Sequence, residues 1–166
     1  ASDPRAPRLR GLLGGLAAAD RVPIARLFRV NDWNWHLGVR REPVDQWPVT
    51  LIGLATLPGD PVRVPPSGYD IGDGYAVIVL FADSQSVTLK YTRDDDVVRG
   101  YTLHLEGLCL DPALLSSYRA LDSTGRAALP AALPLQPIGW ARAELRVAIR
   151  DSGTFMDPRS DKDWWR

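Results

Sequence analysis

The residues with the most evident chemical potential in this sequence are two tryptophans beside one of its two histidines. Trp33 and Trp35 alternate with polar residues in the run Asn31-Asp32-Trp33-Asn34-Trp35-His36. Indole rings placed in this way can stack on the apolar C–H faces of carbohydrate rings. The alternative is that one or both indoles close the core at the end of a sheet, which is the commoner role of a large aromatic side chain. The residues alone leave both interpretations open.

Other reactive residues give weaker signals. Asp94, Asp95 and Asp96 could attract calcium, but they lack the spacing of an EF-hand loop, and consecutive acids are typical of a solvated hairpin tip. Cys109 is the one cysteine, so an intramolecular disulfide is excluded, and its apolar neighbours predict a buried free thiol. Neither a Gly-x-Ser-x-Gly motif nor a phosphate-binding glycine loop is present. The sequence therefore predicts no cofactor and no bound metal.

Composition narrows the classes of partner. The chain has 166 residues, with twenty basic and twenty acidic side chains and a formal net charge of zero. This balance removes the electrostatic argument for nucleic acid or an anionic membrane as a partner. No apolar stretch is long enough to span a bilayer. The sequence starts at Ala1 without a methionine, which fits removal of a secretory signal, so we expect a secreted or cell-surface protein.

The residue pattern predicts a mainly β fold. Apolar or alternating segments separated by Gly, Pro and Asp predict an antiparallel β-sheet or sandwich with one or two short helices. Asp111-Pro112 is a typical helix start and predicts a helix that runs to about residue 121. We expect residues 1–22 to be an N-terminal arm, loose over residues 1–8 and with a short helix or turn at residues 9–19 that covers one end of the sheet, and residues 23–166 to be a single β-domain. The strands are expected at 23–30, 49–57, 62–64, 75–81, 86–93, 97–110 and 144–149.

Several segments resemble, in the right order, the motifs of the LytM/lysostaphin-type zinc endopeptidase domain, a secreted β-rich fold that cuts peptidoglycan cross-links. The resemblance spans residues 30–160. In chain order its segments are His36-Leu-Gly-Val-Arg40, Pro58-Gly-Asp-Pro-Val-Arg-Val-Pro-Pro-Ser-Gly68, Gly74-Tyr-Ala-Val-Ile-Val79, Tyr101-Thr-Leu-His104, Leu135-Gln-Pro-Ile-Gly139, and the closing strand 144–150 ahead of Asp157-Pro158. For the family's Tyr-x-His motif, Tyr91-Thr-Arg93 is an alternative to the segment that begins at Tyr101.

The resemblance also implies that the metal chemistry is lost. The family binds zinc through the first histidine, an aspartate four residues later and a histidine of the closing strand. Here His36 is kept, but Arg40 stands at the aspartate position and Arg146 most nearly at the closing histidine position. A guanidinium has no lone pair to offer and repels a cation. We therefore expect a degenerate, LytM-like domain that is not an enzyme.

The expected function is binding of a glycan or a cell-wall peptide in the former catalytic groove. A second hypothesis is a structural subunit that assembles into a homo-oligomer or filament through Trp164 and Trp165, although these residues could equally fold back on their own core. A third is a zinc endopeptidase with rearranged ligands. The predicted binding residues are Trp33, Trp35, His36, Tyr101, His104 and Arg146.

Overall fold

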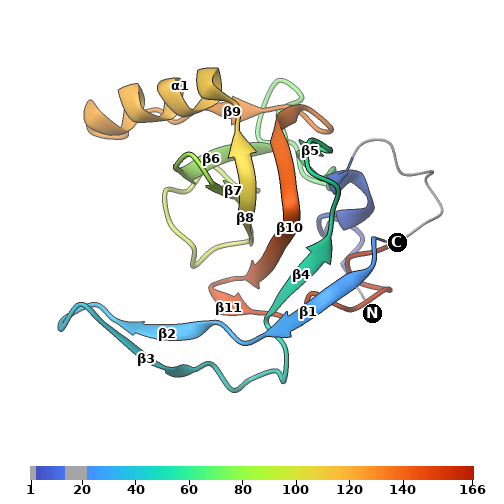
Figure 1. The fold of residues 1–166 in the computed structure, drawn as a ribbon. Helices are drawn as coiled ribbons and strands as arrows, with labels where there is room; N and C mark the ends of the chain where they lie inside the picture. The colour runs from blue at the N-terminus through green and yellow to red at the C-terminus, as the bar shows by residue number, and fades with distance from the viewer. Residues whose placement is uncertain (1–2, 14–21) are drawn as a thin grey trace.

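The structure, a computed structural model, describes residues 3–13 and 22–166 and confirms a mainly β fold with antiparallel strand pairing. Within these residues a nine-stranded sheet has the order β1-β4-β10-β8-β7-β6-β9, and β5 and β11 pair with the two ends of β10 (Figure 1). Its strands are β1 (Ile24–Phe28), β4 (Leu51–Ala55), β5 (Pro61–Arg63), β6 (Val77–Ala82), β7 (Ser86–Lys90), β8 (Tyr101–Leu110), β9 (Ala131–Ala132), β10 (Pro137–Asp151) and β11 (Thr154–Phe155).

Two helices and one separate hairpin lie at the margins of the sheet. The 3₁₀ helix η1 (Leu9–Leu12) and the α-helix α1 (Pro112–Ser123) confirm the expectation of one or two short helices. Asp111 caps α1, since its carboxylate accepts a hydrogen bond from the Ala113 amide at 2.8 Å. Strands β2 (Asn31–Asn34) and β3 (Val39–Pro43) form a separate hairpin that projects from the end of the sheet opposite α1 (Figure 1). No helix among the described residues is long and apolar enough to cross a bilayer.

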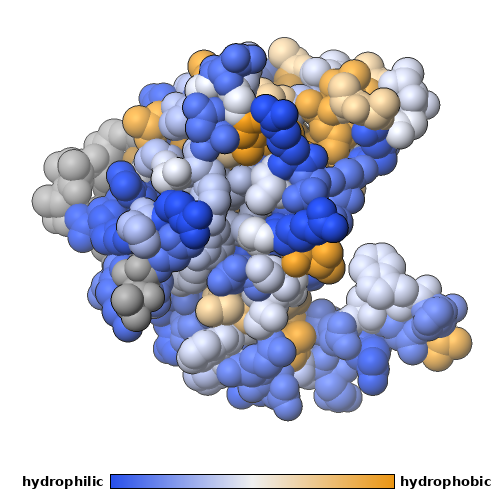
Figure 2. Space-filling model, turned by 180° about the vertical axis from the view of Figure 1, so that it is seen from behind, coloured by the Kyte–Doolittle hydropathy of each residue, from blue (hydrophilic) through white to orange (hydrophobic). Residues whose placement is uncertain are grey.

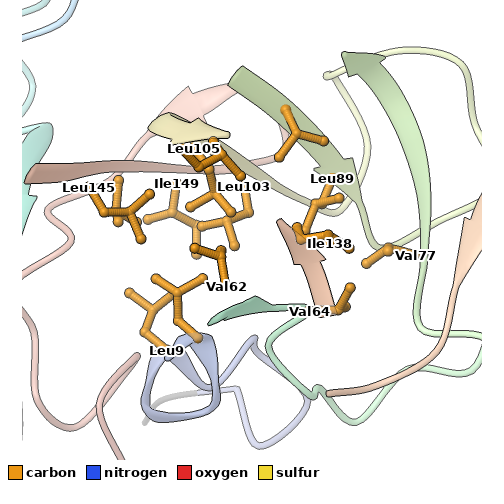
Figure 3. Packing of buried hydrophobic residues seen from close by; sticks show 14 of the residues in the cluster. Leu9, Val62, Val64, Val77, Leu89, Leu103, Leu105, Ile138, Leu145 and Ile149 are labelled. Atoms are coloured by element: carbon orange, nitrogen blue, oxygen red, sulfur yellow. The ribbon is translucent and has the colours of Figure 1, made fainter. Parts of the chain in front are cut away.

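The core lies against one face of the sheet. Side chains from β5, β7, β8 and β10 meet η1 there, as Figure 3 shows for Leu9, Val62, Leu103 and Ile149. Strands β8 and β10 supply this face through the period-2 alternation of a half-buried sheet. On β10, Leu145, Val147 and Ile149 are fully buried, and the residues between them face the other side. The opposite face of the sheet is therefore polar, and it carries the residues that are relevant to a site.

The N-terminal segment packs on this core, which corrects the expectation of a loose segment at residues 3–8 and agrees with the short helix expected from residue 9 onward. Leu9 and Leu12 are buried, and Leu13 forms a β-bridge with Val62. The Leu9 amide donates a hydrogen bond to the Trp164 carbonyl at 2.7 Å, so the two ends of the described chain are joined. Leu9 and Leu12 are three residues apart, so one face of η1 can bury both side chains although Gly11 lies between them. The rest of the expected arm, residues 1–2 and 14–21, lies outside the described residues.

Cys109 faces away from the core, so the prediction of a buried thiol is wrong. Gly107 has a φ of +82°, and the side-chain alternation of β8 shifts by one residue at this position. Leu108 and Leu110 consequently face the core, and Cys109 faces outward beside its partner Trp140. A Cβ at Gly107 would lie 2.2 Å from the Glu144 carbonyl oxygen, so only glycine fits this irregularity.

This orientation predicts the reactivity of the thiol. In the folded protein Cys109 should react with one equivalent of a thiol reagent such as dithionitrobenzoate, because its sulfur is accessible without unfolding. Absorbance of the released thiolate measures the reaction. Labelling that begins only after addition of denaturant would contradict the outward position of Cys109.

Candidate binding site at the β2–β3 hairpin

The tight turn of the β2–β3 hairpin is built by the polar residues that surround the tryptophans. The Asn34 side-chain oxygen accepts hydrogen bonds from the amides of His36 and Leu37 at 3.0 and 3.1 Å. The Gly38 amide closes the turn on the Asn34 carbonyl, and Gly38 has a φ of +63°, a conformation that glycine adopts without strain. Trp35 therefore sits in a defined turn and not on a free loop.

The base of the hairpin is fixed to the sheet. The Val44 amide donates to the Val30 carbonyl at 2.9 Å, and the Val30 amide donates to the Thr50 hydroxyl at 2.8 Å. Across the hairpin, the Asn31 amide group donates to the Arg41 carbonyl, and Arg40 donates to the Asn31 side-chain oxygen. Polar side chains of the hairpin thus hydrogen-bond across its two strands, and the indoles of Trp33 and Trp35 take no part in these bonds.

Trp33 and Trp35 are exposed, so the alternative that both close the core is not met. Their side chains are 44% and 85% exposed, and their ring centroids lie 6.5 Å apart with an interplanar angle of 66°. Leu37 and Val39 on the same hairpin are also exposed. Four exposed apolar side chains on one projecting hairpin are more than chance exposure of single residues, and such patches mark interaction surfaces.

A cavity of about 590 Å³ separates the hairpin from the body of the protein. Its volume falls in the range of about 300–1,000 Å³ that is usual for small-ligand sites. Figure 2 shows the hollow between the projecting hairpin and the sheet. We call this cavity the hairpin groove; its walls include Asp32, Trp33, Trp35, Arg41, Glu42 and Asp45 on the hairpin side and Val97, Arg150, Thr154 and Phe155 on the sheet side.

The sheet side of the groove was not predicted from sequence. Arg150 ends up there because β11 folds back on β10 and pairs Phe155 with Arg150. The guanidinium carbon of Arg150 lies 4.1 Å from the centroid of the Phe155 ring. Arg150 is one of eighteen arginines and Phe155 is one of three phenylalanines, and nothing in the sequence singles out either residue.

The six predicted binding residues are not brought together in one groove. Trp33 and Trp35 line the hairpin groove, and His36 lies exposed in the hairpin turn. Tyr101 is buried in the core against Trp164, with ring centroids 5.8 Å apart, and its hydroxyl donates to Asp3. The prediction that Tyr101 lines a groove is therefore wrong in this structure.

His104 does not line the groove and lies half-buried on β8 behind Phe155. The ring contacts Phe155, with 5.8 Å between centroids, and its Nδ1 is 3.1 Å from the Thr88 hydroxyl. Its Nε2 is buried and has no hydrogen-bond partner among the described residues. Burial, with a smaller contribution from the charge of Arg150, lowers the pKa of His104 to about 4. At neutral pH this histidine is therefore an uncharged, half-buried group.

Arg146 lines a second, separate cavity of about 580 Å³. Its Nε donates to Glu144 at 2.9 Å, and Arg26 donates two further hydrogen bonds to the same carboxylate at 2.6 and 2.8 Å. The hydrogen bonds from Arg26, followed by that from Arg146, lower the pKa of Glu144 to about 2. Arg146 is thus engaged in an ion-pair cluster, and the structure separates it from the hairpin.

The residues present do not fit the zinc that a LytM-like domain implies. His36 lies in the hairpin turn, Arg40 donates to Asn31, and Arg146 is bound to Glu144. Among residues 3–13 and 22–166 no three His, Cys, Asp or Glu side chains gather closely enough to hold a metal ion. The aspartates considered for calcium each face a different cation: Asp94 faces Arg99, Asp95 faces Arg126 and Asp96 faces Lys90.

No known protein family, curated protein or solved structure matches this chain. The resemblance to the LytM-like domain therefore remains a prediction from short motifs. What can be argued about function comes from the hairpin groove itself.

Trp164 and Trp165 do not form the exposed pair that an assembly surface requires. Both are buried, and their indole nitrogens donate to the carbonyls of Asp157 and Pro158 at 2.8 Å each. The residues that end the described chain therefore fold back on their own core, which was one of the two alternatives left open by the sequence.

Proposed function

We propose that this protein is a non-catalytic glycan-binding protein that acts outside the cell and binds its ligand in the hairpin groove. The observation that carries the proposal is the exposure of Trp33 and Trp35 on a hydrogen-bonded hairpin beside a cavity of ligand size. A carbohydrate ring presents apolar C–H groups on one face and hydroxyls at its edge. Indoles bind the face, and planar polar side chains such as those of Asp32 and Arg41 bind the edge.

The chemistry of the groove favours a glycan over a peptide as its ligand. An extended peptide would be bound by a free strand edge or by a deep apolar pocket for its side chains. The strands β2 and β3 each have one partner among the described residues, so an unpaired edge alone does not separate the two ligand classes; the lining does, because the groove combines two exposed indoles with several charged side chains, which suit the apolar face and the hydroxylated edge of a sugar ring. The resemblance to a peptidoglycan-directed domain adds the expectation of a cell-wall glycan. A peptide ligand is an alternative outcome of the test below.

Two observations support a non-catalytic role. The positions at which the LytM-like family carries metal ligands hold Arg40 and Arg146, and both guanidinium groups are engaged by neighbouring side chains. The alternative of a subunit that assembles through Trp164 and Trp165 has less support, because both indoles are buried in their own chain.

Replacing Trp35 with alanine should weaken glycan binding about tenfold or more, because a stacked aromatic is the typical centre of such a site. The fold should be kept, since the Trp35 side chain is 85% exposed. Binding is measured on a glycan array and then by titration calorimetry with the best oligosaccharide. A parallel array of cell-wall peptides identifies a peptide ligand.

Trp140→Ala is the matched control for this experiment. Trp140 is also exposed, at 47%, but it lies on β10 away from the hairpin groove. The Trp140→Ala variant should bind the glycan as tightly as the wild type does. Silence of the glycan array, or equal binding by the wild type and Trp35→Ala, would refute the proposed function.

A further inference from the structure

Arg150 occupies an unusual position in the hairpin groove. Its guanidinium carbon lies 4.1 Å from the centroid of the Phe155 ring, and this cation–π contact holds the group against the wall of the groove. A guanidinium held in this way presents a rigid fork that matches the two oxygens of a carboxylate. The groove therefore contains a preorganised donor group in addition to its aromatic residues.

The charge of Arg150 is not paired within the described residues. No carboxylate there lies within 4.0 Å of its guanidinium nitrogens, and its Nε is buried without a hydrogen-bond partner. Arg146 is the instructive comparison: it lies over Phe28 in the same way, at 4.9 Å, but it is bound to Glu144. Burial lowers the pKa of Arg150, and the more distant charge of Asp32 offsets this only in part.

The row of residues behind the groove does not supply the missing acid. In the sheet register Lys90 on β7 pairs with Thr102 on β8, and Thr102 pairs with Arg150 on β10. The Thr102 hydroxyl is also buried and has no hydrogen-bond partner in the described part of the chain, and the Lys90 Nζ is 3.9 Å from an Asp96 carboxylate oxygen. Lys90 and Arg150 thus lie on either side of Thr102 in this row across the sheet, and no acidic residue stands between them. A half-buried, unpaired arginine is costly, and an anionic ligand in the groove would offset that cost.

We propose that the hairpin groove selects glycans that carry a carboxylate, with Arg150 binding the carboxylate while Trp33 and Trp35 stack on the sugar. This inference rests on the proposed function, because it assigns the acid-binding subsite of the same groove. The other charged groups limit the ligand further. Asp32 faces Arg41 at 3.6 Å, but Glu42 and Asp45 also line the groove and repel additional acids. The ligand is therefore a sugar with one carboxylate, and not a polyanion with an acid on every ring.

The test compares sodium glucuronate with glucose, which differ only in the oxidation of C6, and with N-acetylglycine as a peptide-like carboxylate. Each is titrated into ¹⁵N-labelled full-length protein, and the indole and arginine Nε–H signals are followed by NMR. Glucuronate should bind about tenfold more tightly than glucose, because a charge-assisted bidentate pair is added to the same stacking contact. It should also bind more tightly than N-acetylglycine and tetragalacturonate.

Arg150→Gln should abolish the preference for glucuronate over glucose and leave the weaker glucose binding in place. Arg150→Lys keeps the charge but loses the planar fork, so it should keep the fold and lose most of the preference. Arg142→Gln, which removes an exposed arginine from the same strand, should behave as the wild type. A thermal melt of each variant separates loss of folding from loss of binding.

Each other outcome has a defined meaning. Equal binding of glucuronate and glucose, lost in Trp35→Ala, refutes the carboxylate subsite and leaves the glycan site standing. A glucuronate preference that persists in Arg150→Gln and in Arg150→Lys also refutes the role of Arg150. Tighter binding of N-acetylglycine assigns the subsite to a peptide carboxylate, which overturns both proposals. Absence of any glucuronate signal overturns the acid subsite, whatever the glycan array shows.

Discussion

Replacing Trp165 with alanine should lower the free energy of unfolding by about 3–5 kcal/mol, the usual cost of truncating a fully buried aromatic side chain. The Trp165 side chain is 2% exposed, and its indole nitrogen donates to the Pro158 carbonyl at 2.8 Å. The truncation would leave a large cavity and an unsatisfied carbonyl between the C-terminal turn and the N-terminal segment. The measurement is urea denaturation followed by circular dichroism.

Trp140→Ala serves as the control, because Trp140 is 47% exposed and its truncation should cost about 1 kcal/mol or less. Light scattering of the wild type at several concentrations, with Trp165→Ala beside it, tests the assembly hypothesis at the same time. A Trp165→Ala variant as stable as Trp140→Ala, or one that dissociates from an oligomer into folded monomers, would show that the indole serves an interface and not the core.

The strands were predictable because their alternation is a direct consequence of the pleat. Thr88 and Lys90 alternate with Val87 and Leu89, and this pattern fixed β7 as a strand with one apolar face. The start of α1 was predictable from Asp111 and Pro112, since a capping carboxylate and a residue without an amide proton suit the first turn. These features depend on local residue types alone, and the structure confirms them.

Features that depend on a single backbone irregularity or on distant pairing were not predictable. One glycine with positive φ, Gly107, reverses the facing of the residues that follow it, so Cys109 was assigned to the wrong side of the sheet. The ends of the described chain carry no periodicity that distinguishes an exposed indole from a buried one. Their burial comes from the turn that places Trp165 on its own core and from the bond between Leu9 and Trp164.

Half of the candidate site was visible in the sequence. Trp33 and Trp35 stand among asparagine and aspartate residues, a polar context that suits exposed indoles, and the structure exposes both. The other wall was hidden, because Arg150 and Phe155 become neighbours only when β11 pairs with β10. The remaining predicted residues came from the LytM-like resemblance, and the structure distributes them among the core, the hairpin turn and a second cavity.

His104 should make the stability of the protein depend on pH between neutrality and pH 5. Its pKa is about 4 in the folded protein and about 6.5 in the unfolded chain. The unfolded chain therefore binds more protons over this interval, so stability falls as the pH falls from 6.5 towards 4. From these two pKa values the free energy of unfolding should decrease by about 2 kcal/mol between pH 7 and pH 5. The interval ends above the range in which Glu144, with a pKa of about 2, loses its own contribution.

The measurement is a series of urea denaturation curves at half-unit steps of pH. His104→Asn removes the titrating group and should flatten the dependence between pH 7 and pH 5, even if its stability at pH 7 is lower. His36→Asn removes the other histidine, which is exposed in the hairpin turn, and should keep the wild-type slope. A slope that survives in His104→Asn would mean that another group carries the pH dependence and that burial does not lower the pKa of His104 in the folded protein.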